Sequence, residues 1–306
     1  MLLAGEKASQ DVTADGHESQ SGVLRFPMAT AAYYCCFPVV EIQQTFYNMP
    51  RIRTAERWRK EAMTARARTD QAEFEETMAD MIDLHTFSIV ARDPKTGEYG
   101  VAVSTARPNV GSLVPFVSRR GAIATQGRVN SDLGRQGLAH LEQGVPIRLA
   151  LRTLLETDPD REIRQVHAVD GSGAFCHTGA RCVEWCGHLE GDGFTVAGNM
   201  LTGPQVIQDM AGVFRSSTND QRELPECLLL ALEAGQKAGG DKRGKQSAAL
   251  LVASSEPRMY HNLRVDHHTE PVVELRRIYN LVVVHMAQIE REYGAEGVRL
   301  FGRVKY

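Results

Sequence analysis

The sequence predicts an α+β protein in which helices cover the faces of sheets. The predicted elements are segregated along the chain: strands, two helices, strands, two helices, strands and a last helix, with no internal repeat. A wound βαβ protein instead alternates single strands with single helices. The 306 residues are 42% hydrophobic and 24% charged, which is the composition of a globular protein with a sizeable core.

Three regions differ in composition. Residues 1–84 are polar and rich in Ser, Gly and Asp up to about residue 27, and they lack Gly and Pro from Arg51 to Leu84. This pattern predicts an extension that is first disordered and then helical. Residues 85–285 contain the regular hydrophobic patterns and form the predicted domain, and residues 286–306 form a C-terminal helix or tail.

The domain opens with a predicted β-hairpin. Two strands rich in β-branched residues, Thr86–Asp93 and Glu98–Ser104, flank the turn Pro94–Gly97. Ser131 is the expected N-cap of the first helix. The remaining elements are predicted as strands at 109–117 and 121–126, helices at 131–143 and 146–156, strands at 163–168, 173–177 and 194–197, helices at 204–214 and 224–237, a strand at 248–253, a strand or loop at 262–268, and a helix at 271–292.

Charge and apolar patterning exclude several classes of partner. The formal net charge of −3 provides no strong field for nucleic acid or anionic membrane, so neither is expected as a partner. No apolar stretch reaches the length of a membrane span, and the N-terminus lacks the apolar segment of a signal peptide. Six cysteines are too few for a disulfide scaffold. We therefore expect a cytoplasmic protein in a reducing compartment.

One glycine-rich segment is close to a nucleotide-binding motif. Gly239–Ser247 matches G-x-x-x-x-G-K-[ST] except that Gln246 stands where Ser or Thr is required. A phosphate loop follows a strand and opens a helix, whereas this segment follows a predicted helix and precedes a strand. No nucleotide or other cofactor is therefore expected.

Two clusters could hold a metal ion. Cys176, Cys182 and Cys186 lie close to two histidines in sequence, but without the C-x-x-C spacing of a zinc site they are predicted to be unligated thiols. Asp266, His267 and His268 are consecutive, and the residues alone leave open a metal site or an ion-paired strand end.

Several polar residues are candidates for catalysis or binding. Asp241, Arg243 and Ser247 stand at the mouth of an apolar strand, between glycines that permit close approach of a ligand, although a solvated turn has the same composition. Arg264 beside Asp266 could bind a charged substrate group. Asn199 after Gly198 suits an oxyanion donor, and a Gly-Asn pair is also common in turns.

Thr86 is the most specific candidate. A Thr at the start of a strand is usually only a good β-former. If Thr86 were the first residue of a mature chain, its hydroxyl could act as nucleophile and its own α-amine as base. That amine has a reference pKa of about 7.7–8.0, so it is substantially neutral near physiological pH.

Together these segments resemble a domain-of-unknown-function family placed among the N-terminal nucleophile (Ntn) hydrolases. The resemblance covers roughly residues 85–280. The matching motifs are Thr86-Phe-Ser-Ile-Val-Ala-Arg-Asp93, Ala124-Thr-Gln126, Gly134-x-x-Gly-Leu138, Arg164-Gln-Val166, Gly198-Asn-Met-Leu201, Gly239-Gly-Asp-x-Arg-Gly-x-Gln-Ser-Ala248 and Leu263-Arg-Val-Asp266.

The resemblance implies a four-layer αββα sandwich and hydrolysis of an amide bond in a small molecule or peptide, with Thr86 as nucleophile and no metal or cofactor. Some relatives carry a peptidoglycan-binding module, which hints at cell-wall amides. We assign catalytic roles to Asn199, Asp241 and Arg243. The expected substrate-binding residues are Gln126, Ser247, Arg264 and Asp266. A homo-oligomer is compatible with this reading.

Two features depart from the family pattern. The family starts at or near this Thr, whereas here a leader precedes it, so the expectation is cleavage between His85 and Thr86 or a true start at Met78 or Met81. His267 also stands where a second carboxylate is expected. Two alternatives therefore remain: an inactive Ntn-like binding or assembly module that keeps its leader, and a metal-dependent hydrolase.

Overall fold

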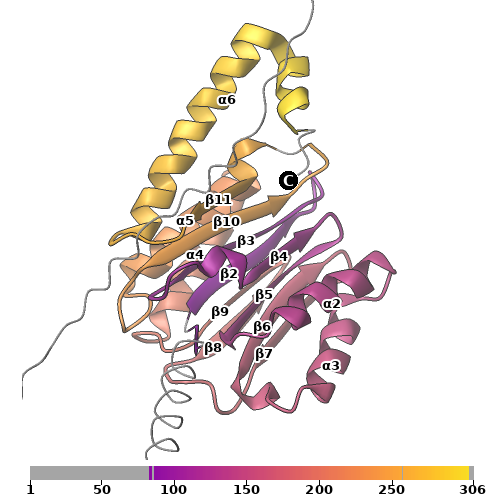
Figure 1. Cartoon of the computed structure of the whole chain (residues 1–306), viewed down its shortest axis with the longest axis vertical. Coiled ribbons are helices and arrows are strands. Elements are labelled where there is room, and N and C mark those ends of the chain that lie inside the picture. The colour runs from indigo at the N-terminus through magenta and orange to yellow at the C-terminus, as the bar shows by residue number, and fades with distance from the viewer. Residues whose placement is uncertain (1–82, 85, 257, 303–306) are drawn as a thin grey trace, which may run out of the picture. The chain divides into compact units, whose positions relative to one another are not determined.

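The computed structural model describes residues 83–84, 86–256 and 258–302, and these form a mixed α+β fold (Figure 1). Every strand pair in its two sheets is antiparallel. The predicted α+β class is confirmed. Most of the extension, including the predicted helix up to residue 82, lies outside the described residues.

The six-stranded sheet contains the predicted hairpin at its centre. Its strand order is β11-β10-β3-β2-β9-β8, so β2 lies between β3 and β9. The strands are β2 (Thr86–Asp93), β3 (Glu98–Thr105), β8 (Gly187–Gly191), β9 (Phe194–Gly198), β10 (Ser247–Ala253) and β11 (Asn262–Val265).

The five-stranded sheet is built around β5. β6 pairs with one edge of β5, and β4 and β1 pair with β5 as well. The strands are β1 (Asp83–Leu84), β4 (Pro115–Ser118), β5 (Gly121–Arg128), β6 (Arg164–Asp170) and β7 (Ala174–Thr178).

Five α-helices are present in the described residues. α2 and α3 lie over the five-stranded sheet, and α4 and α5 lie behind the six-stranded sheet (Figure 1). The helices are α2 (Ser131–Glu142), α3 (Ile147–Thr157), α4 (Gln205–Asn219), α5 (Leu224–Lys237) and α6 (Pro271–Gly302).

The buried side chains form three main clusters, because each sheet is buried on both faces. One cluster lies between the sheets and includes Val90 and Val103 from one sheet with Ala122 and Ala124 from the other. A second joins the six-stranded sheet to α4, α5 and the start of α6, and a third joins the five-stranded sheet to α2 and α3. The face between the sheets is the one on which the candidate site lies.

Four local predictions are corrected by the structure. The strand predicted at 109–117 is a 3-10 turn, Val110–Ser112, followed by β4, because Asn109 adopts a left-handed φ of 63°. The N-cap of α2 is Asn130, whose side chain accepts from the Asp132 amide at 3.1 Å, and not Ser131. Residues 83–84 are a strand rather than a helix end, and β8 was not predicted.

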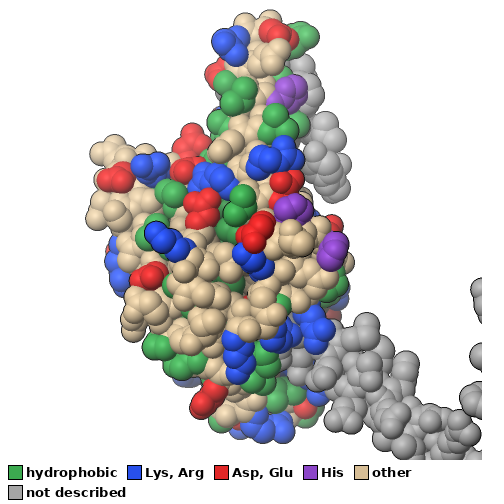
Figure 2. Space-filling model, turned by 90° about the vertical axis from the view of Figure 1, so that its left-hand side faces the viewer, with side chains coloured by type: hydrophobic (Ala, Val, Ile, Leu, Met, Phe, Trp, Pro, Cys, Tyr) green, Lys and Arg blue, Asp and Glu red, His purple; other side chains and the backbone are tan. Residues whose placement is uncertain are grey.

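The last helix, α6, is interrupted at Gly294, where φ is 68°. Its outer face exposes several apolar side chains, and hydrophobic and charged groups are interspersed on the view in Figure 2. The exposed apolar residues of α6 are Val273, Leu281, Val283, Val284 and Tyr293. Among the described residues, no helix is both long enough and apolar enough to cross a membrane.

Candidate active site

The strand registers bring four of the predicted site residues into one line with a fifth residue. Thr86 pairs with Thr105 on β3, and Thr105 pairs in turn with Ser247 on β10. One step beyond the paired residues, Asn199 lies opposite Thr86 and Asp266 lies opposite Ser247. Directly opposed residues in antiparallel sheets point to the same face. We call this line, Asn199, Thr86, Thr105, Ser247 and Asp266, the Thr86 row.

The Thr86 row faces the other sheet. Phe87 and Ile89 pack toward the helices, so Thr86, Ser88 and Val90 point into the space between the sheets. The Asn199 amide donates to the Thr86 carbonyl at 3.1 Å, which fixes the end of β9 against the start of β2. Thr86 is 0% exposed.

Asn199 is held by a buried hydrogen-bond chain that crosses between the sheets. Its Nδ2 donates to Gln165 Oε1 at 2.9 Å, and Gln126 Nε2 donates to the same oxygen at 2.8 Å. Ser88 then connects Gln126 to His167. We call this set the inter-sheet chain, and its members, all fully buried, are Asn199, Gln165, Gln126, Ser88, His167 and Thr195.

Two backbone carbonyls determine the direction of every hydrogen bond in this chain. Gly187 and Gly198 present carbonyl oxygens to one end of the Gln165 side chain, at 3.1 and 2.9 Å. A carbonyl can only accept, so that end is Nε2 and the other end is Oε1. Gln126 must therefore donate to Gln165 and accept from Ser88 Oγ, at 2.6 Å.

The same logic assigns the tautomer of His167. The single Ser88 proton is used on Gln126, so Ser88 Oγ must accept from His167 Nε2 at 2.7 Å. Nδ1 then accepts from Thr195 Oγ1 at 2.9 Å. Burial, with a smaller contribution from nearby His188, lowers the pKa of His167 to about 3, so the ring is neutral at physiological pH. The inter-sheet chain thus has one proton arrangement, which holds the Asn199 amide in one orientation.

Asp241 and Arg243 form a tight pair one residue from the row. Arg243 donates to Asp241 through Nη2 at 2.7 Å and Nε at 3.1 Å, and the Asp241 side chain is fully buried. The Asp241 carboxylate also accepts from the amide of Ala106, which follows Thr105. The sequence named both residues as candidates without predicting that they pair, and the pair anchors the strand end opposite Thr86.

Ser247 and Gln126 are both committed to internal contacts. Ser247 Oγ donates to the Arg107 carbonyl at 2.6 Å and accepts from the Val110 amide at 3.1 Å. It thereby fixes the loop after β3. Gln126 lies inside the inter-sheet chain. The structure places both residues where they position neighbours.

Arg264 and Asp266 pair with each other at the end of the row. Arg264 donates to Asp266 Oδ1 from Nη2 at 2.8 Å and from Nε at 3.1 Å, and it also contacts Asn109 Oδ1. The ion pair is partly exposed. The ion-paired strand end considered from the sequence is therefore present.

Within the described residues, the structure does not bring three possible metal ligands together at either cluster considered from the sequence. His267 bonds to the Gln246 side chain, and His268 accepts from the Glu270 amide. In the described ranges no group of three or more His, Cys, Asp or Glu residues could hold a metal ion. Cys176 and Cys186 are free thiols, and burial, followed by the nearby Glu190 carboxylate, raises the pKa of Cys176 to about 12.

A small cavity adjoins the row. It has a volume of about 120 Å³ and includes Asn199 with Gly127 at the end of β5. Two cations, Arg128 and Arg181, also line it, with no acidic residue among its described lining residues. The other lining residues are Ile163, Cys182 and Val183. Asn199 links this cavity to the start of β2, because its backbone amide donates to the Thr86 carbonyl.

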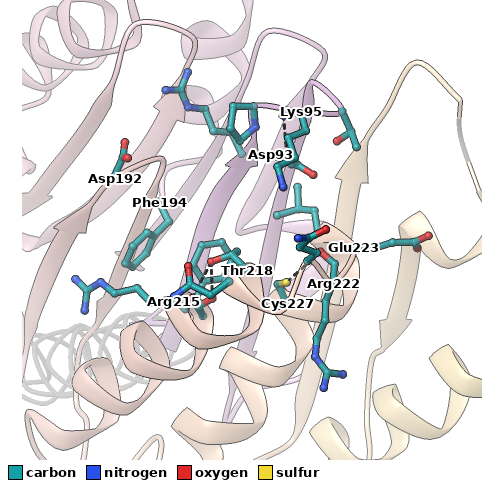
Figure 3. Close-up of a pocket in the computed structure, with 16 residues that line it drawn as sticks. Asp93, Lys95, Asp192, Phe194, Arg215, Thr218, Arg222, Glu223 and Cys227 are labelled. Atoms are coloured by element: carbon teal, nitrogen blue, oxygen red, sulfur yellow. Dashed lines mark hydrogen bonds between the residues drawn. The ribbon is translucent and has the colours of Figure 1, made fainter.

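A larger cavity of about 620 Å³ lies at the opposite end of β2 (Figure 3). It is lined by Asp93 at the end of β2 and by residues of α4 and α5, and Arg215 stacks over the ring of Phe194 at 5.2 Å. Asp93 is seven residues from Thr86 along an extended strand, or about 23 Å. None of the predicted site residues lines this cavity, so we place the candidate active site at the Thr86 row.

Comparison with models of protein families assigns the chain to a family. The model of a family of unknown function, DUF1028, matches residues 86–275, and the match begins at Thr86 itself. The chain is a member of this family. The predicted resemblance to a domain-of-unknown-function family is therefore confirmed.

A solved member of the family is similar in structure. The crystal structure of protein SPO2555 from Silicibacter pomeroyi, of the same DUF1028 family model, is 32% identical, with a TM-score of 0.59. The similarity covers 64% of this chain and 85% of that one. No functionally curated protein matches the chain.

Sequence analysis did not single out Ser88, Gln165, His167 and Thr195. The sequence does contain a pattern that marks them: polar residues occupy every second position of a strand whose intervening positions are apolar, as Gln165 and His167 do in β6. Such alternation usually marks a strand with one face in water. Here that face is covered by the second sheet, so the polar residues bond to one another.

Proposed function

We propose that this protein is an amidohydrolase that uses Thr86 as an N-terminal nucleophile after removal of the preceding chain. The observation that carries the proposal is the Thr86 row: the hydroxyl lies on the inter-sheet face, next to Asn199 and one residue from the Asp241–Arg243 pair. The start of the family match at Thr86 supports the same reading. The packing of two sheets between helix layers is compatible with an αββα sandwich of the Ntn type.

The chemistry follows from the groups at the row. Thr86 Oγ attacks the substrate carbonyl, and the freed α-amine of Thr86 takes the hydroxyl proton. The C–N bond breaks, and the leaving amine receives that proton, which leaves an ester on Thr86. Water, deprotonated by the same amine, then hydrolyses the ester and regenerates the hydroxyl.

We propose that Asn199 stabilises the oxyanion. One Nδ2 proton is used on Gln165, and the amide nitrogen is thereby oriented before substrate binds. Preorganised donors of this kind stabilise the charge that develops in the transition state. We expect Asn199→Ala to lower kcat by roughly a hundredfold, measured under saturating substrate.

The test uses a reagent that acylates N-terminal threonine, such as a β-lactone, because the substrate is unidentified. We expect one adduct per chain, located at Thr86 by peptide mass mapping, and none in Thr86→Ala. Thr96→Ala, an exposed Thr in the β2–β3 turn, is the matched control and should be labelled normally. Labelling elsewhere, or undiminished labelling of Thr86→Ala, would refute the proposal.

A second function is favoured by one observation. While the chain is uncut, the Thr86 nitrogen is a peptide nitrogen and the residue is wholly buried. A protein that keeps its leader is then the inactive binding or assembly module considered above. The N-terminal residue of the purified protein distinguishes the two functions.

A further inference from the structure

The pairing of β1 points to the kind of substrate. β6 pairs with β5 from Gly121 to Gly127 and so occupies one whole edge of that strand. β4 and β1 must therefore share the other edge. β4 pairs with Gly121–Ala124, and β1 pairs with Gly127 and Arg128. Only the leader strand covers the last part of this edge in the described residues.

We propose that, in the mature protein, this edge of β5 binds the acyl side of an extended peptide, with an acidic residue opposite Arg128. This inference rests on the proposed function, because it takes the Thr86 row as the place where the carbonyl is attacked. Removing β1 leaves the backbone groups of Gly127 and Arg128 without their strand partner, and such edges bind peptides by strand addition.

The register relates the edge to the nucleophile. Leu84 pairs with Gly127, and Thr86 opens β2 two residues later. A peptide bound in the register of β1 would therefore present to Thr86 the carbonyl group of the residue that corresponds to position 85, which directly follows the residue paired with Gly127. The leader is then the first occupant of the acyl side of the site, and a substrate is the second.

Charge favours an acidic residue at one defined position. Asp83 is the register partner of Arg128, three residues before the bond to be cut. Arg128 and Arg181 line the adjoining cavity of about 120 Å³. A peptide with Asp or Glu at this position meets two cations there, whereas Lys or Arg meets like charge.

The experiment separates binding from chemistry. The full chain is expressed with a protease site inserted after His85, so that cleavage leaves position 86 as the first residue. It is folded and cut, and the leader is removed, so maturation does not depend on the protein's own activity. The receptor carries Thr86→Ala. The ligand is a synthetic peptide with the sequence of residues 78–85, and binding is measured by fluorescence anisotropy and by amide hydrogen exchange.

We expect saturable binding that slows hydrogen exchange at Gly127 and Arg128. An Asp83→Lys peptide should bind about tenfold more weakly, and Arg128→Glu in the receptor should reverse that preference. Asp80→Lys makes the same charge change at a residue other than the two register partners of β5, Asp83 and Leu84, and is the control for the peptide. Arg120→Glu, at an exposed cation paired with Glu142, is the control for the receptor.

Three results would overturn the inference: no binding, binding without protection of β5, or equal weakening by the two lysine substitutions. These outcomes are independent of the proposed function. If the β-lactone acylates Thr86 but the peptide does not bind, only this inference fails. If the peptide binds but Thr86 is never acylated, the proposed function fails and the peptide-binding edge stands.

Discussion

Gln165 is the residue on which the geometry of Asn199 depends. Its Oε1 accepts from Asn199 and Gln126, and its Nε2 donates to two glycine carbonyls. A leucine of similar size would remove these hydrogen bonds, and each buried group that finds no other partner costs about 1–3 kcal/mol. We predict that Gln165→Leu lowers the free energy of unfolding by roughly 3 kcal/mol, measured by urea denaturation.

The matched control for Gln165→Leu is Gln208→Leu, at an exposed position of α4. It makes the same chemical change without burying an unpaired group, and its effect should lie within about 0.5 kcal/mol. Similar effects of the two substitutions would show that the inter-sheet chain contributes nothing specific to stability.

His167 should make the stability depend on pH. Burial lowers its pKa to about 3 in the folded protein, against about 6.5 in an unfolded chain. The unfolded state therefore binds more protons between these values. Stability is fully present above pH 6.5 and falls as the pH drops toward 3. We predict a loss of about 2 kcal/mol from this residue between pH 7 and pH 5.

The prediction is checked by measuring the free energy of unfolding in urea for the wild type and for His167→Gln, each at pH 7 and at pH 5. The variant should lose less stability on acidification, even if it is less stable at pH 7. His285→Gln, at an exposed position of α6, should keep the wild-type pH dependence. An unchanged slope in His167→Gln would mean that the ring is not held neutral in the folded protein.

At the residue scale, the sequence identified Thr86, Asn199, Ser247 and Asp266 as separate candidates. Their alignment into one row depends on strand registers that no local pattern encodes. The inter-sheet chain was missed because burial of a strand's second face depends on the other sheet.

Among the elements, α2 approaches the five-stranded sheet closely because it carries two glycines on its inner face. A Cβ at Gly134 would lie 2.2 Å from the ring of Phe116, and one at Gly137 would lie 2.6 Å from Ile123. We predict that Gly134→Ala destabilises the protein by about 1–3 kcal/mol through overpacking, despite the better helix propensity of Ala.

Gly212→Ala in α4 is the matched control for this prediction. A Cβ there would meet nothing within 4 Å. The substitution should stabilise the protein by up to about 1 kcal/mol, because it removes only the conformational cost of glycine in a helix. Thermal unfolding of both variants tests the pair, and a neutral or stabilising Gly134→Ala would contradict the close packing of α2.

Elements with strong local signals were predicted well. The β2–β3 hairpin and α5 (Leu224–Lys237) have the predicted positions, because each has a clear hydrophobic pattern, with turn residues between the two strands and a proline in the first turn of the helix. β8 (Gly187–Gly191) was missed because it is short, polar and bounded by glycines. Its place in the sheet comes from pairing with β9 rather than from propensity.

At the scale of the whole molecule, the sequence predicted the fold class but not which segments share a sheet. β1 and β2 are separated by one residue and belong to different sheets. That arrangement puts Thr86 at the point where the chain passes from one sheet to the other. On the proposed function, removal of the leader would free the Thr86 amine and the neighbouring edge of β5 together.

The central claim is tested most directly by the intact mass of the protein that is active. Active material should have the mass of a chain that begins at Thr86, and Thr86→Ala should abolish activity. Full activity in a chain whose Thr86 is still joined to His85 would contradict the account.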